Sequence, residues 1–286
     1  VKRPLLTIPT LDIHFNRQVN DGVKLSKQKD MIPVLGIISE ELEKENLLVN
    51  LIASELNIDA AQILDFDLYL YDTTPGCLFG LNNEFISSGR LDDLSMACAG
   101  IDALLGSETN DQTQIVAIFD NEETGSGTKQ GAGSPFLASI IERIVLAQGG
   151  NKEGFYIAIE QAFMVSADNA HAWHPNYADK FDPTNHPVMG GGPTIKINAS
   201  QKYATDAEGA AIFAEICRKA EVPFQLFVNH SDILGGSTLG NILTGSLPMR
   251  GVDMGAAIWA MHSARETGSV ADHINTVKAF TTFFNI

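Results

Sequence analysis

The feature that most constrains the fold is a regular alternation of apolar runs and amphipathic stretches after Gly89. Short apolar runs bounded by Pro, Gly, Asn or Asp are typical of strands, whereas longer stretches with apolar residues every three or four positions are typical of helices. We expect strands at 113–120, 155–165, 193–198, 223–229 and 255–260. We expect helices at 91–106, 134–148, 206–220 and 269–284. This alternation predicts a layered α/β domain, which we place at residues 86–286.

The first part of the chain, residues 1–85, is less regular. Short strand-like runs occur at 5–8 and 63–71. Between them, residues 39–58 begin with a serine and early glutamates and continue with apolar residues at helical spacing, which predicts a helix with one buried face. We interpret this part as a small α+β module.

Composition excludes several classes of partner. The chain has 35 acidic against 19 basic residues and a formal charge of −16, so its field repels nucleic acid phosphates and anionic lipid headgroups. Its apolar stretches are too short to span a bilayer, and we therefore expect neither a nucleic acid nor a membrane partner. The three cysteines form no CxxC pair. Their odd number and wide separation favour a reducing compartment and a cytoplasmic location.

Four polar clusters directly follow apolar runs, at 120–123, 166–171, 230–232 and 261–266. Ligands of open α/β sheets bind beyond the carboxyl ends of the strands, so these clusters can converge on one cleft. Carboxylates and imidazoles together suit zinc, cobalt or manganese. The abundance of acids favours two ions that share a bridging carboxylate and a water.

Adjacent glutamates give the sharpest hypothesis. Neighbouring residues at a strand end point in different directions, so Glu123 can ligate a metal while Glu122 acts as general base. Asp168 and His262 are the further candidate ligands by position. An isolated DNEE sequence is more often a solvated acidic turn, and a lone histidine such as His262 or His171 is as often a structural residue.

A glycine-rich stretch, LGGSTLGNIL, precedes a possible helix start at Ser237 or Thr238. Backbone N–H groups at such a start, including that of Gly236, can face a developing oxyanion or a substrate carboxylate. There is no GxGxxG or Walker pattern, and nucleotide binding therefore has no support.

Seven segments, in order along nearly the whole chain, together resemble the aspartyl aminopeptidases of peptidase family M18. They are IPTLDIHFNR, SSGRLDDL, DNEETGSGTKQGAGS, SADNAHAWHPNY, INASQKYATD, GGSTLGN and MRGVDMGAAIWAMHSARE. The resemblance implies a mixed-sheet, phosphorylase/hydrolase-like catalytic domain at 86–286. It also implies that residues 1–85 are the remainder of an inserted oligomerisation domain.

The resemblance assigns roles to particular residues. Asp92 of GRLDDL would bridge two divalent ions, most naturally zinc, with Glu122 as general base. The metal ligands that match the family pattern would be Asp92, Glu123, Asp168 and His262. The substrate-binding positions would be Lys196, Tyr203, His171 and Gly236. From position alone, Asp92 would be interpreted only as an acid at a helix N-terminus.

The implied activity is release of amino-terminal residues, preferentially Asp or Glu, from peptides with a free amino terminus. In the family, a further ligand histidine in an HxD segment precedes everything found in this sequence, and His14 belongs to a later family segment. We therefore expect a truncated chain or a missing partner segment, and by resemblance a homo-oligomer, the family's dodecamer. The alternatives are another two-metal amide hydrolase such as a deacylase, and an inactive fragment.

Overall fold

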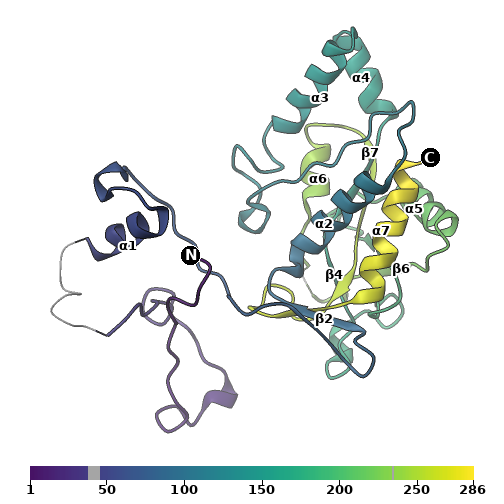
Figure 1. Ribbon diagram of the computed structural model, residues 1–286. Helices are drawn as coiled ribbons and strands as arrows, with labels where there is room; N and C mark the ends of the chain where they lie inside the picture. The colour runs from purple at the N-terminus through teal and green to yellow at the C-terminus, as the bar shows by residue number, and fades with distance from the viewer. Residues whose placement is uncertain (38–45, 234) are drawn as a thin grey trace. The chain divides into compact units, whose positions relative to one another are not determined.

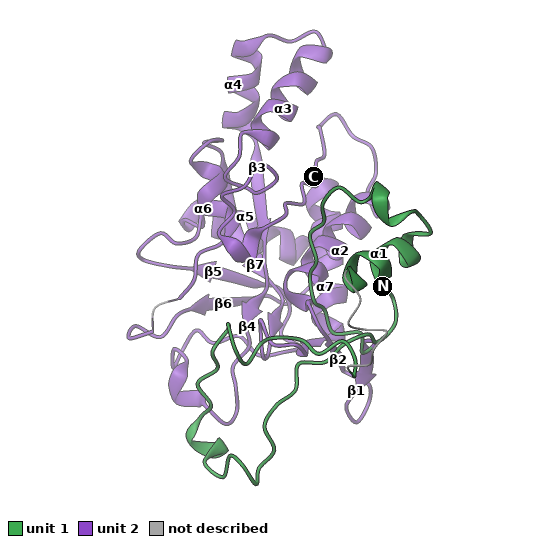
Figure 2. Ribbon diagram, turned by 90° about the vertical axis from the view of Figure 1, so that its left-hand side faces the viewer, with its two compact units in different colours: residues 1–74 green, residues 75–286 purple. Residues whose placement is uncertain are grey.

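The computed structural model describes residues 1–37, 46–233 and 235–286. It contains two compact units, residues 1–74 and residues 75–286 (Figure 2). The boundary falls before the predicted one at residue 85, because the strands that follow Pro75 pair with the C-terminal part of the chain. The functional assignment of the two predicted domains stays a prediction.

The first unit has little regular structure. Its described elements are the 3-10 helices η1 (Val19–Asp21) and η2 (Ala60–Gln62) and the helix α1 (Leu47–Leu56). Helix α1 confirms the second half of the predicted helix, whose first part, 39–45, lies outside the described residues. The strands predicted at 5–8 and 63–71 are wrong, because their backbones find no strand partner in the described part of the unit beyond one bridge, Thr7 to Val34.

The second unit is built around a four-stranded sheet with the order β3-β7-β5-β6. The pairs β3–β7 and β5–β6 are parallel, and β5–β7 is antiparallel, so the sheet is mixed. The strands are β3 (Phe163–Ala167), β5 (Thr194–Ile197), β6 (Gln225–Val228) and β7 (Arg250–Gly255). The predicted layered α/β architecture is therefore confirmed.

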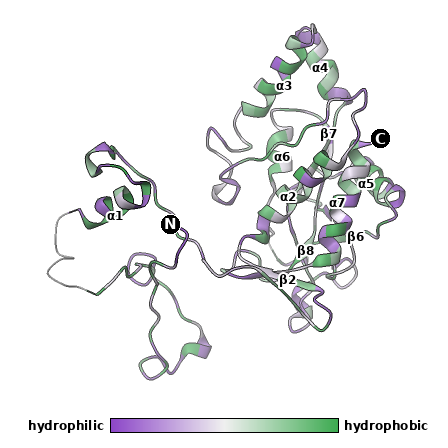
Figure 3. Cartoon of the chain, viewed as in Figure 1, coloured by the Kyte–Doolittle hydropathy of each residue, from purple (hydrophilic) through white to green (hydrophobic). Residues whose placement is uncertain are grey.

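Helices cover both faces of this sheet (Figure 1). On one face, α2 (Leu91–Gly106), α5 (Ala207–Lys219) and α7 (Val270–Phe284) pack apolar residues into the main core with Val252 and Met254 of β7. On the other side lie α6 (Leu239–Thr244) and the hairpin of α3 (Phe136–Ala147) and α4 (Lys152–Gln161). Helix α3 is predominantly hydrophobic (Figure 3). Its residues join a second core cluster around Phe155, Ile159 and Leu247.

Two small sheets lie at one end of this unit. Strands β1 (Cys77–Phe79), β2 (Phe85–Ser88) and β9 (Glu266–Ser269) form an antiparallel sheet. Strands β4 (Ala170–His171) and β8 (Ala257–Ile258) pair in parallel. The sequence patterns did not predict β1, β2 or β9, because these strands are short and their pairing partners are distant in the chain.

The helices predicted in this unit are confirmed, and so are the strands at 193–198 and 223–229. The last predicted strand begins earlier, at Arg250. The first half of the strand predicted at 155–165 is wrong: those residues continue α4, which Asn151 caps by accepting the Gly154 N–H. The strand predicted at 113–120 is also wrong, because this stretch has no ladder partner among the described residues.

Helix α5 packs its backbone directly against β7. Gly209 is buried at the third position of α5, and a Cβ built there would meet the carbonyl of Gly251, with its carbon at 3.0 Å. The N–H of Gly209 donates to Asp206 at the helix start. Glycine is therefore required by the close approach of the helix to the strand.

We expect Gly209→Ala to lower the free energy of unfolding by about 1–3 kcal/mol, because the added methyl group forces α5 away from β7. Gly154→Ala is the matched control: it is also third in its helix behind a capping Asn, and its Cβ would meet only ordinary contacts at 3.6 Å or more. That change should be neutral or stabilise by up to about 1 kcal/mol. Urea unfolding of both variants tests this, and equal effects would contradict the packing argument.

Candidate metal centre

Three predicted ligands meet where separate elements of the second unit end. The Nε2 atom of His262 lies 3.0 Å from Oδ2 of Asp92 and 3.3 Å from Oε2 of Glu123. Asp92 lies in the first turn of α2, Glu123 in the 3-10 helix η3 (Glu122–Thr124), and His262 in the loop before β9. One ligand atom from each lies within 4.8 Å of the others, which is compatible with a single ion.

A second group shares Asp92. Ligand atoms of Asp92, Asp93 and Asp168 also lie within 4.8 Å of one another. The Oδ1 atoms of Asp92 and Asp93 are buried and have no hydrogen-bond partner in the described structure. Buried carboxylate oxygens without donors are costly unless a cation accompanies them. The arrangement therefore fits two cation positions that share Asp92, with oxygen and nitrogen donors suited to zinc.

The protonation of these groups reflects the same crowding. Burial, followed by the nearby charges of Asp168 and Glu123, raises the pKa of Asp92 to about 7. Burial, followed by the charges of Asp168 and Asp92, raises the pKa of Asp93 well above its usual range. Like charges in a low-dielectric site disfavour ionisation, and a divalent cation would reverse this effect.

Glu122 lies beside this group. Burial, followed by the charges of Asp168 and Glu123, raises the pKa of the Glu122 carboxyl. Its side chain is therefore coupled to both sets of acidic residues without belonging to either group of potential ligands. A carboxylate with a raised pKa is a better proton acceptor, which agrees with the role of general base.

The predicted substrate residues Lys196 and Tyr203 lie next to Asp168. Lys196 is only 3% exposed, and its Nζ donates to Oδ2 of Asp168 at 3.0 Å. Burial acts to lower the pKa of Lys196, but the charge and hydrogen bond of Asp168 and the charges of Tyr203 and Asp253 together outweigh it, and the pKa is raised. The Nζ atom lies 5.7 Å from the centre of the Tyr203 ring. Lys196 therefore neutralises an acidic residue of the centre, a role that the sequence did not indicate.

The other two predicted substrate positions, His171 and Gly236, line a separate cavity of about 350 Å³ together with Phe227 and Trp259. The ring of His171 lies 5.9 Å from that of Phe227. Desolvation, followed by the charge of Lys196, lowers the pKa of His171 and so favours its neutral form. His171 and Gly236 therefore line one cavity, as expected if both contact the same ligand.

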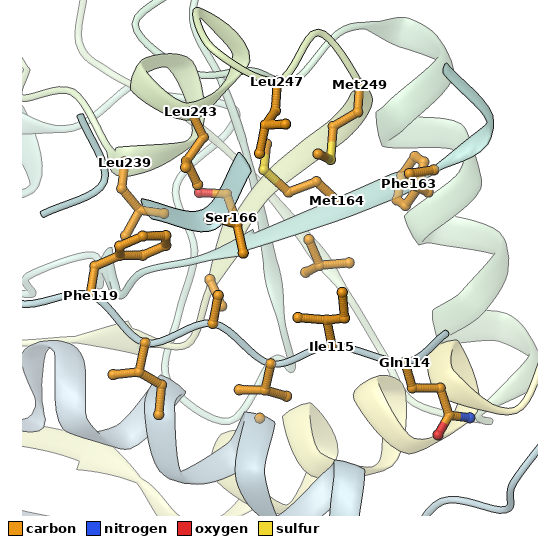
Figure 4. A pocket seen from close by; sticks show the side chains of 18 of the residues that line it. Gln114, Ile115, Phe119, Phe163, Met164, Ser166, Leu239, Leu243, Leu247 and Met249 are labelled. Atoms are coloured by element: carbon orange, nitrogen blue, oxygen red, sulfur yellow. The ribbon is translucent and has the colours of Figure 1, made fainter. Parts of the chain in front are cut away.

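A large apolar cavity of about 910 Å³ leads away from the acidic residues. One wall is the stretch 115–119, and the facing wall is β3, with Met164 and Ser166 (Figure 4). Residues of α6 and of the segment after it, including Leu243 and Leu247, close the side. The acidic residues Asp92, Glu122 and Asp168 lie among its lining residues. The cavity therefore separates the predicted strand 113–120 from the sheet edge and opens onto the candidate centre.

Sequence reasoning missed two residues of the centre, Asp93 and Glu266. Glu266 is 1% exposed and accepts two backbone N–H groups, from Asp92 at 2.9 Å and from His262 at 2.6 Å. One carboxylate thereby fixes the backbones of two potential ligands that lie close in space but near opposite ends of the unit's sequence. Its only sequence signal is its place four residues after His262, in a cluster that already looked polar.

Comparison with known proteins identifies relatives along the whole chain. The family described as aminopeptidase I zinc metalloprotease (M18) matches residues 1–284. A probable M18 family aminopeptidase 2 of Clostridium acetobutylicum is 50% identical over 100% of this chain and 66% of its own length. A protein of the same name from Stutzerimonas stutzeri is 40% identical over 99% of the chain and 66% of its own length. The chain thus spans slightly less than two thirds of these curated relatives.

Solved structures agree with these sequence relationships. A chain in the cryo-EM structure of the Ape4 and Nbr1 complex superposes with a TM-score of 0.93 at 35% identity, over 99% of this chain and 58% of that one. The S. cerevisiae mApe1 dodecamer superposes with a TM-score of 0.79 at 26% identity, over 98% of this chain and 62% of that one.

We expect Glu266→Gln to weaken divalent-ion binding about 10–100-fold, because one of the two backbone N–H groups that hold the centre loses its acceptor. Competition with a chromophoric chelator measures the affinity, and circular dichroism checks the fold. Glu215→Gln, at an exposed residue paired with Arg218 on α5, is the control and should change neither. Unchanged affinity in a folded Glu266→Gln protein would contradict this role.

Proposed function

This chain belongs to the M18 family of zinc metalloproteases, and we propose that it carries most of the centre of an aminopeptidase that uses two divalent ions. The convergence of two three-residue groups on Asp92 supports this proposal, since a shared carboxylate is what a pair of ions requires. Glu122 lies beside both groups, where a general base is needed.

We further propose a homo-oligomer of twelve subunits and, from the cysteine pattern of the sequence, a cytoplasmic location. The dodecameric mApe1 structure, which is 26% identical over 98% of this chain, supports the proposed oligomer. In the described residues, no helix is long and apolar enough to cross a membrane.

Bound divalent ions would lower the pKa of a water and polarise the carbonyl of the first peptide bond. Asp92, Glu123, Asp168 and His262 would hold them, with Asp93 as an additional ligand. Glu122 accepts the proton of the attacking water as the water oxygen bonds to the carbonyl carbon. As the carbon–nitrogen bond breaks, Glu122 gives a proton to the leaving amine.

Glu122→Gln tests this assignment. The amide keeps the shape of the side chain but accepts no proton, so turnover should fall at least about 100-fold while metal content and folding stay near wild type. Asp120→Asn, two residues earlier on the same segment, is the control and should retain most turnover. Blocking the amino terminus of the peptide should also abolish hydrolysis, because an aminopeptidase acts on substrates with a free amino group. A deacylase would still cleave the blocked substrate. Near-normal turnover in Glu122→Gln would refute the base.

We propose a preference for acidic amino-terminal residues, supported by the buried positive charge of Lys196. A carboxylate side chain placed next to Nζ would form a charge-assisted hydrogen bond in a site of low dielectric. Tyr203, whose ring centre lies 5.7 Å from this ammonium, would donate a further hydrogen bond to the reacting carbonyl oxygen. Gly236 and His171 would contact the rest of the substrate from the neighbouring cavity.

Lys196→Ala should reduce cleavage of substrates that begin with Asp or Glu about 10–100-fold more than cleavage of neutral ones, which corresponds to about 1.5–3 kcal/mol. The measured quantity is the loss for acidic substrates divided by the loss for neutral ones. Cleavage of all substrates falls when Asp168 loses its ion-pair partner, and this common loss cancels in the ratio. Lys202→Ala is the control, because Lys202 bonds the carbonyl of Gly235 and not an acidic residue. Equal losses for acidic and neutral substrates would contradict the preference.

The centre needs a further nitrogen ligand, which we propose comes from residues outside this chain. In the described part, the two groups around Asp92 contain one histidine, His262. This chain spans 66% of the length of the curated relatives, and the cavity between 115–119 and β3 has room for an extended segment. A strand there would pair with the free edge of β3 and end near the acidic residues.

The 286-residue chain alone should therefore hold one of its two ions weakly and lose most of the activity of the complete enzyme. Metal analysis after dialysis, together with hydrolysis of a peptide that begins with Asp, measures both properties. The complete protein, prepared in the same way, is the control. Two tightly held ions and full activity in the isolated chain would show that the missing ligand has been misidentified.

A further inference from the structure

A second set of side chains that could hold a metal ion lies on the outer side of the packed helices α2 and α7. Cys98 and Asp102 are one helical turn apart on α2, and the Sγ atom of Cys98 lies 3.7 Å from Oδ2 of Asp102. His273 reaches them from α7, which packs along α2 (Figure 1). One ligand atom from each of the three residues lies within 4.8 Å of the others.

We propose that Cys98, Asp102 and His273 form a surface site for a transition-metal ion of the zinc class, separate from the centre around Asp92. Sulfur, imidazole nitrogen and carboxylate oxygen are all zinc ligands, and hard ions such as calcium or magnesium do not choose this set. Cys98 and Asp102 are exposed, so an ion reaches the site from solvent and keeps a position open for water. The net charge of −16 favours cation binding in general.

The three donors are held on rigid elements. The adjacent face of α2 is fixed in the core by Ala99 and Ala103, both fully buried. In α7, the residue before His273 is the buried Asp272, which accepts the N–H groups of Gly190 and Gly192 at 2.7 Å each. Ligands carried by fixed helices lose little freedom on binding, so three donors suffice for a defined site.

The site is separate from the acidic centre in both place and chemistry. Cys98 lies six residues beyond Asp92 in the chain, and its group shares no residue with either group around Asp92. In the described structure, neither group of residues around Asp92 contains a sulfur ligand. The other two cysteines do not compete, since Cys217 is fully buried and Cys77 lies beside Arg265.

An ion at this site links α2 to α7. Since Asp92 and Asp93 lie in the first turn of α2, the ion also restrains the helix that presents these two carboxylates. Burial, followed by the charge of Asp102, raises the pKa of the Cys98 thiol, so metal binding displaces a proton from sulfur. The expected consequence is a higher unfolding temperature in the presence of zinc, separate from any effect on turnover.

Cobalt(II) titration of the complete protein, freed of metal with a chelator, tests the site. A thiolate bonded to cobalt gives a near-ultraviolet charge-transfer band that oxygen and nitrogen ligands do not give. We expect this band in the wild type and in Cys77→Ser, and its loss in Cys98→Ser. His273→Ala and Asp102→Asn should weaken cobalt binding at least about tenfold.

Circular dichroism confirms that each variant is folded, and zinc should raise the unfolding temperature of the wild type more than that of Cys98→Ser. Retention of the band in Cys98→Ser would overturn the proposal. Its absence from the folded wild type, or an unchanged cobalt affinity in His273→Ala, would also overturn it. Because the readout is a sulfur bond, the result does not depend on whether the Asp92 centre catalyses peptide hydrolysis.

Discussion

Repulsion among carboxylates is the constraint on which the second unit depends. Asp92, Asp93 and Asp168 bring ligand atoms within 4.8 Å of one another, and Glu123 adds a fourth carboxylate through His262. Burial, and after it the neighbouring negative charges, raise the pKa values of Asp92 and Asp93, so the charged state is disfavoured. A fold that assembles these groups from three separate segments gains little from them unless a cation binds.

Other buried polar residues hold the carboxylates in place. Glu266 joins the backbones of Asp92 and His262, so the start of α2 and the loop before β9 keep a fixed relation. Asp253 on β7 is fully buried and accepts hydrogen bonds from Ser166 on β3, from Thr238 at the start of α6, and from the N–H of Ala204. It thereby ties the strand before Asp168 to the loop that follows Tyr203. These contacts join residues far apart in the sequence, which rigidifies the site.

The sequence predicted what depends on local spacing. Helices α2, α5 and α7 follow from apolar residues that recur every three or four positions, and Glu122, Glu123, Asp168 and His262 are predicted as site residues because they follow apolar runs. The stretch 155–161 was misread as a strand, since its apolar run hides a helical pair, Phe155 and Ile159, behind an Asn cap. Asp93 and Glu266 were missed because burial, which sets their chemistry, is a property of the tertiary structure.

The segment that we propose to lie outside this chain would account for both the unpaired stretch 115–119 and the single histidine of the Asp92 groups. The stretch 115–119 and Asp92 both border the same cavity, which runs from the edge of β3 to the acidic residues. An apolar segment that enters it would bury the walls formed by Ile115 and Met164 and would pair with the sheet edge. Its end would then lie beside Asp92, where a further ligand is required. In this proposal, completion of the sheet and completion of the metal centre would be one event, and sheet stability and metal affinity should rise together.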